Sequence, residues 1–185
     1  MPENMIYAGI GSRQTPEPIC NLFTHLGEWF GSHGLTLRSG HADGADIAFE
    51  RGCVKSGGSM EIYLPWSGFN GSKSNLVYRR YDGSTEIARE LHPSFDTLPI
   101  QAKMLHARNS YQILGYDLGT PCDFVACWTP GGGASGGTGQ AIRLAKQYNV
   151  PVFDFGVYRE YAEAKQRFND FYKALRDAKR KEALL

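Results

Sequence analysis

Short apolar segments alternate with helical patterns along most of this chain. The segments have the length and residue types of strands that are buried on both faces of a sheet. They are residues 5–10, 35–39, 60–64, 123–128 and 151–155. This alternation predicts an α/β fold: a Rossmann-like, doubly wound and mainly parallel sheet of about five strands, with helices on both faces.

Apolar residues recur at helical spacing between these segments. The predicted helices span about residues 17–32, 45–54, 86–91, 99–116 and 137–148, followed by a charged amphipathic stretch over 157–185. Thr15 is expected to cap the first helix, with Pro16 in its first turn and Gly31 and Gly34 at its end. Residues 66–82 show no regular pattern and are expected to be irregular.

The pattern predicts one domain with a helical extension. Residues 1–156 form the predicted Rossmann-like domain, and residues 157–185 are expected to form an amphipathic helical segment packed on it. A chain of 185 residues is long enough to bury a substantial core. The first residues lack a basic region followed by a long apolar run, so the protein is expected to be cytoplasmic, with no membrane span.

Composition excludes some classes of function. The net charge is +1, from 20 basic and 19 acidic residues, which does not favour a general DNA-coating role. Cys20, Cys53, Cys122 and Cys127 lack the CxxC spacing of metal sites and are expected to be buried thiols. We therefore expect no metal site and no cofactor.

The most informative stretch is the glycine-rich loop at residues 130–139, between a predicted strand and a predicted helix. A strand, a glycine loop and a helix N-terminus in this order gather free backbone N–H groups at one point, and the helix dipole adds positive charge there. The alternative is a merely flexible loop, but the position favours a phosphate site. The expected ligand contacts here are Pro130, Gly131, Gly132, Gly133, Ser135, Gly136, Gly137 and Thr138.

Two further loops of small residues follow the first and second predicted strands. They contribute Gly9, Gly11, Ser12 and Arg13, and Ser39, Gly40, Gly44, Ala45 and Asp46. Ligands of doubly wound folds bind beyond the carboxyl ends of the strands, so the three loops together predict the rim of a nucleotide pocket.

Several of these residues have a simpler alternative role. Arg13 could clamp a phosphate in bidentate fashion or lie solvated on the surface. Asp46 could bind a ribose hydroxyl or only meet the dipole of its helix. Thr138 could donate to phosphate or cap its helix.

Two other segments remain open. Spacing alone places Arg108 and Asn109 on a solvated helix face. Trp66 and Phe69 could stack against a base or cover the core.

Five motifs follow one another along the chain. They are Gly9-Ile10-Gly11-Ser12-Arg13, Ser39-Gly40 with Gly44-Ala45-Asp46, Tyr63-Leu64-Pro65, His106-Ala107-Arg108-Asn109, and Pro130-Gly131-Gly132 with Gly137-Thr138. In this order they resemble the motifs of the SLOG superfamily of Rossmann-type nucleotide-binding proteins, which includes the DNA-processing protein A family and the lonely-guy phosphoribohydrolases. The resemblance covers about residues 5–155. It implies a phosphate site in the glycine loops, a functional Arg108 and a homo-oligomer.

The chain departs from both families. Ser110 replaces the second arginine of the Arg-Asn-Arg pattern in the DNA-processing family. Gln140 stands near the place of the lonely-guy glutamate, and an amide cannot act as a general base. If the protein is a hydrolase, the candidate catalytic residues are Arg108 and Asp46.

Three functions remain open at this point. The first is a nucleotide-binding protein that senses or sequesters a phosphorylated nucleoside or an ADP-ribose-like signal. The second is a hydrolase that cleaves the N-glycosidic bond of a nucleotide. The third is a DNA-processing protein that binds single-stranded DNA, which requires a basic groove.

Overall fold

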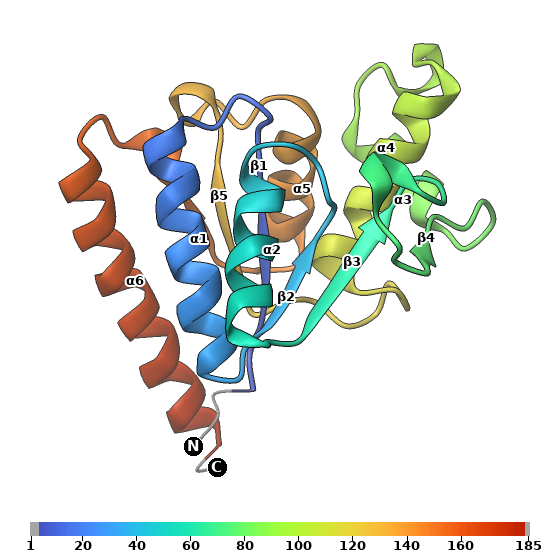
Figure 1. The fold of residues 1–185 in the computed structure, drawn as a ribbon. Coiled ribbons are helices and arrows are strands. Elements are labelled where there is room, and N and C mark those ends of the chain that lie inside the picture. Colours follow the sequence, from blue (N-terminus) through green and yellow to red (C-terminus); the bar gives the residue numbers. More distant parts are fainter. Residues whose placement is uncertain (1–3, 184–185) are drawn as a thin grey trace.

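The computed structural model describes residues 4–183 as a three-layer α/β fold (Figure 1). Its sheet has six parallel strands among these residues, in the order β4-β3-β2-β1-β5-β6. The strands are β1 (Ile6–Gly11), β2 (Thr36–Ser39), β3 (Met60–Leu64), β4 (Leu76–Val77), β5 (Phe124–Trp128) and β6 (Val152–Asp154). The helices are α1 (Glu17–Ser32), α2 (Ala45–Ser56), α3 (Ser84–Leu91), α4 (Ile100–Leu114), α5 (Gly136–Gln147) and α6 (Tyr161–Glu182).

The predicted doubly wound parallel sheet is confirmed, with two local corrections. The two-residue strand β4 lies in the segment expected to be irregular, and it pairs with Tyr63 and Leu64 of β3. The predicted cap at Thr15 is wrong, because the N-cap position of α1 is Pro16. The hydroxyl of Thr15 instead donates to the carbonyl of Ser12 over 2.6 Å and closes the turn after β1.

Helices cover both faces of the sheet. Figure 1 shows α1, α2 and α6 on one face and α5 on the other. Strand β1 illustrates why, because its side chains alternate between the faces. Tyr7 lies in a cluster with Phe30 of α1 and Phe168 of α6, whereas Ile10 lies in a second cluster with Ile142 of α5.

Helices α1 and α2 are in very close contact, and this contact sets the position of α2. A Cβ atom at Gly52 would lie 2.0 Å from the carbonyl oxygen of Thr24, and one at Gly27 would lie 2.4 Å from that of Phe49. The hydroxyl of Thr24 also donates to the carbonyl of Ala48 over 3.1 Å. The two backbones therefore meet directly, and the start of α2 is held at the carboxyl edge of the sheet.

The chain winds in both directions from β1. Strand β2 pairs with one side of β1 and β5 with the other, so their connections diverge at this edge of the sheet. Such a divergence opens a crevice beyond the carboxyl ends of the strands. Among residues 4–183, no helix combines the length and the apolar character that crossing a membrane requires.

Candidate functional site

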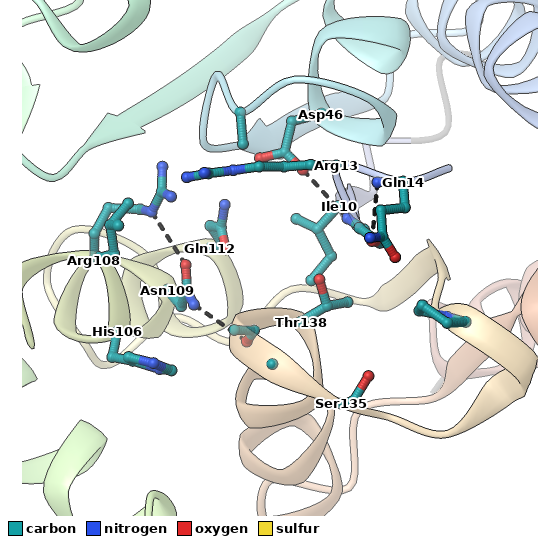
Figure 2. Close-up of a pocket in the computed structure, with 17 residues that line it drawn as sticks. Ile10, Arg13, Gln14, Asp46, His106, Arg108, Asn109, Gln112, Ser135 and Thr138 are labelled. Carbon is teal, nitrogen blue, oxygen red and sulfur yellow. Dashed lines mark hydrogen bonds between the residues drawn. The ribbon is translucent and has the colours of Figure 1, made fainter. Parts of the chain in front are cut away.

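A cavity of about 410 Å³ lies at the carboxyl ends of β1 and β5, where the chain diverges. Figure 2 shows side chains around it that come from the loop after β1, the start of α2, helix α4 and the start of α5. The predicted residues that line it are Gly11, Ser12, Arg13, Asp46, Arg108, Asn109, Pro130, Ser135, Gly136, Gly137 and Thr138. The structure therefore brings together residues from all three predicted loops.

The N-terminus of α5 forms one wall of this cavity. Its first helical hydrogen bond runs from the N–H of Gly139 to the carbonyl of Ser135 over 3.0 Å. The amides of residues 136–138 consequently have no acceptor within the helix, and no side chain of the described residues caps them. A Cβ at position 139 would lie 1.7 Å from the Ala134 carbonyl oxygen, so glycine is required for the loop to turn this tightly.

Arg108 is buried in the floor of the cavity rather than solvated. Only 4% of this residue is exposed, so the interpretation from helical spacing was wrong. Its guanidinium donates to the carbonyl of Gly40 and, over 2.9 Å, to that of Tyr63. Burial lowers the pKa of Arg108 to about 10, which leaves the side chain cationic at neutral pH.

Asn109 is also buried, and it joins α4 to the glycine loop. Its Oδ1 accepts from Nε of Arg108 over 3.1 Å, and its Nδ2 donates to the carbonyl of Gly137 over 3.1 Å. Both ends of the amide are thus used within the protein.

Arg13 supplies a second cation at the same place. It is exposed and makes no ion pair with the described residues. Figure 2 shows its side chain extended across the cavity toward Arg108. The charge of Arg13 contributes to the lowered pKa of Arg108, as expected for two cations in proximity.

Asp46 connects two of the loops. Its Oδ1 accepts the N–H of Gly11 over 3.2 Å, and its Oδ2 accepts that of Gly40 over 3.0 Å. It is the only carboxylate among the described residues that line the cavity. Burial raises the pKa of Asp46 to about 7, although the charge of Arg108 opposes that rise.

The other predicted contact residues lie outside the cavity lining. They are Gly9, Ser39, Gly40, Gly44, Ala45, Gly131, Gly132 and Gly133. Ser39 is fully buried, and its hydroxyl donates to the carbonyl of Gly9 over 2.7 Å, so it joins two strands instead of facing the cavity. Gly44 has a φ of +85° and lets the start of α2 approach the turn at Ser12.

Gln140 also lies outside the cavity. It is fully buried between α5 and α4, where its Nε2 donates to the carbonyl of His106 over 3.0 Å. The side chain of Gln140 is therefore turned away from the site.

The aromatic loop covers the core instead of lining the cavity. Phe69 is 6% exposed and belongs to the main core cluster, and Trp66 packs against it. Their rings meet edge to face with centroids 5.3 Å apart. Among the two alternatives for this loop, the structure supports the core-covering role.

Sequence reasoning missed some of the lining. Ile10, Gln14, Ala42, Leu105, His106 and Gln112 also face the cavity. One signal was present, because Leu105, Arg108, Asn109 and Gln112 follow the i, i+3, i+4, i+7 spacing of a single helix face.

Comparison with known proteins supports the fold. No protein-family model matches this chain, and no curated protein sequence matches it significantly. A solved structure of DNA processing protein A from Helicobacter pylori, described for its single-stranded DNA binding mode, is similar with a TM-score of 0.55 and 20% identity. The match covers 81% of this chain and 64% of that one. The fold is like that of DNA processing protein A.

Proposed function

We propose that this protein binds a nucleotide, or another phosphorylated nucleoside such as an ADP-ribose-like signal, in the cavity at the carboxyl edge of the sheet. The observation that carries the proposal is the convergence of three positive groups. The side chains of Arg13 and Arg108 and the uncapped N-terminus of α5 all line the same cavity. A phosphate group would receive charge-assisted hydrogen bonds from such a set.

The proximity of the two arginines supports the same proposal. Arg13 and Arg108 repel each other, whereas the carboxylate of Asp46 favours the charged form of Arg108. An anion between the two guanidinium groups would offset this repulsion. The cavity volume of about 410 Å³ also falls within the range of about 300–1,000 Å³ that is typical of small-molecule sites.

Binding without turnover fits the lining better than hydrolysis. A hydrolase needs a carboxylate that is free to act on water or on the sugar. Gln140 points away, and both oxygens of Asp46 are held by the amides of Gly11 and Gly40. We therefore favour a protein that senses or sequesters its ligand.

Isothermal titration of the full chain tests this proposal. The ligands are the four ribonucleoside 5′-monophosphates and ADP-ribose, with unphosphorylated adenosine as the control ligand. We expect at least one phosphorylated ligand to bind, and Arg13→Ala to weaken it about tenfold or more, the size expected for a hydrogen bond to a charged group. The control variant is Arg51→Ala on the exposed side of α2, which should bind as the wild type does. Failure of every phosphorylated ligand at submillimolar concentration would exclude the proposal.

Binding of single-stranded DNA is a second candidate, favoured by the similarity to DNA processing protein A. Phosphates of a strand could use the same two arginines. Fluorescence anisotropy with a labelled oligonucleotide separates the two candidates. Strand binding should weaken steeply as salt rises, because counterions are released from the DNA. Binding of mononucleotides with no response to the oligonucleotide at low salt would remove this candidate.

A further inference from the structure

Gln112 differs from its polar neighbours in the floor of the cavity. It lies one turn after Arg108 on α4, is only 3% exposed and lines the cavity. The amide of Asn109, which also lines the cavity, makes hydrogen bonds within the protein at both ends. The side-chain amide of Gln112 makes no hydrogen bond with the described residues, whereas Asn109 and Tyr111, which precede it on α4, both do.

The unused amide belongs to the cavity lining, and its nitrogen lies next to Gly40. Gly40 packs against both Arg108 and Gln112, since a Cβ at Gly40 would lie 2.2 Å from the first and 2.4 Å from the second. Figure 2 shows Gln112 between Arg108 and Ile10, with Asn109 on the same helix face. A bound ligand can therefore complete the hydrogen bonds of this amide.

We propose that Gln112 is a specificity-determining residue that recognises the edge of a nucleobase, an inference that rests on the proposed nucleotide site. An amide presents one acceptor and one pair of donors side by side, which matches a base edge with a neighbouring donor and acceptor. Gln112 therefore pairs in bidentate fashion with such an edge, and the ligand is a nucleotide rather than a simple sugar phosphate.

The remaining lining supports a base at this position. Arg13 and the N-terminus of α5 supply the positive charge that binds phosphate. The neutral amide of Gln112 is therefore available for another part of the ligand. Apolar side chains from Ile10, Ala42 and Leu105 line the same cavity. Flat apolar contact on the ring faces and a polar contact at the ring edge are the combination that a base requires.

The test compares ligands with and without a base. Ribose 5-phosphate and the four ribonucleoside 5′-monophosphates are titrated into the wild type, Gln112→Met and Gln112→Glu. Methionine keeps the length of the side chain without its hydrogen bonds, and glutamate keeps only acceptors. Gln101→Met is the matched control, because Gln101 is exposed in the first turn of the same helix. Thermal unfolding of each variant verifies that it folds.

We expect the preferred nucleotide to bind the wild type more tightly than ribose 5-phosphate does. Gln112→Met should weaken that nucleotide about tenfold or more, as bidentate base contacts do. It should leave ribose 5-phosphate unchanged, and Gln101→Met should change neither. If phosphate ligands bind but the nucleotide shows no advantage, or Gln112→Met binds it normally, this inference is wrong and the anion site stands. If no phosphorylated ligand binds, both proposals fail.

Discussion

Gln140 and His106 are joined by two hydrogen bonds between neighbouring helices. The amide nitrogen of Gln140 donates to the backbone carbonyl of His106 over 3.0 Å, and its amide oxygen contacts Nδ1 of the same histidine. Burial lowers the pKa of His106, so the neutral imidazole that can donate to this oxygen is favoured. The pair fastens α5 to α4 behind the cavity, which gives this position a structural role.

Gln140→Glu is therefore expected to give no hydrolase. The new carboxylate would lie against His106, outside the cavity. It could not donate a hydrogen bond to the backbone carbonyl of His106, as Nε2 of Gln140 does. We expect no release of base from nucleoside monophosphates and a loss of about 1–3 kcal/mol in the free energy of unfolding. Chromatography detects any released base, and urea unfolding measures the loss of stability. Gln147→Glu, at an exposed position of α5, is the control and should alter neither. Base release by Gln140→Glu above the control rate would contradict this interpretation.

Asp46→Asn should change how stability depends on pH. The pKa of Asp46 is about 7 in the folded protein, above the value near 3.8 of an unburied carboxyl. The folded state therefore binds more protons than the unfolded state between these values, and the stabilising contribution of Asp46 is lost as pH rises from about 4 to 7. The free energy of unfolding of the wild type relative to Asp46→Asn should fall across that window by an amount on the order of a few kcal/mol. Urea unfolding of both proteins at pH 4, 5.5 and 7 measures this difference. If the free energy of unfolding depends on pH equally in the two proteins, the raised pKa of Asp46 is refuted.

Tyr7→Phe should stabilise the protein. The ring of Tyr7 is fully buried among aromatic residues, and its hydroxyl has no hydrogen-bond partner among the described residues. Removing an unpartnered buried hydroxyl should raise the free energy of unfolding by about 1 kcal/mol. Tyr111→Phe is the matched control. Its hydroxyl donates to Asp82 over 2.6 Å, so the same change there should destabilise. Equal losses in both variants would show that Tyr7 has a partner in solution.

Gly52→Ala should destabilise the contact between α1 and α2. The added methyl group would overlap the carbonyl oxygen of Thr24, which belongs to the backbone and cannot rotate away. Separating the helices should cost about 1–3 kcal/mol or more. Gly119→Ala is the control, since the nearest atom to its added Cβ lies 3.8 Å away. Thermal unfolding measures the melting temperatures of the two variants. Similar melting temperatures would argue against a tight contact between α1 and α2.

The layers of the fold were predictable because its strands are buried on both sides. Such strands are nearly continuous apolar runs, and β1 and β5 stand out in the sequence for this reason. Strand β4 was not predictable, because two residues carry no periodic pattern. Its pairing depends on Tyr63 and Leu64, which are thirteen residues earlier in the chain than their partners Leu76 and Val77.

The loops of the site could be predicted from the sequence, but the burial of Arg108 in its floor could not. Glycine and small residues after β1 and β5 indicate ligand loops by local chemistry alone. The burial of Arg108 instead depends on carbonyls of Tyr63 and Gly40, which are 45 and 68 residues away in the chain. No local pattern contains such contacts, so a buried arginine resembles a solvated one. Gln112 was missed although it shares one face of α4 with Leu105, Arg108 and Asn109, a spacing that the sequence does contain.

The outermost strands of the sheet have a consequence for assembly. Strand β4 has two residues and β6 has three, so neither edge offers a long row of free backbone groups to another chain. Short edges of this kind protect a protein against strand-to-strand polymerisation. A continuous sheet between two copies of this chain is therefore disfavoured.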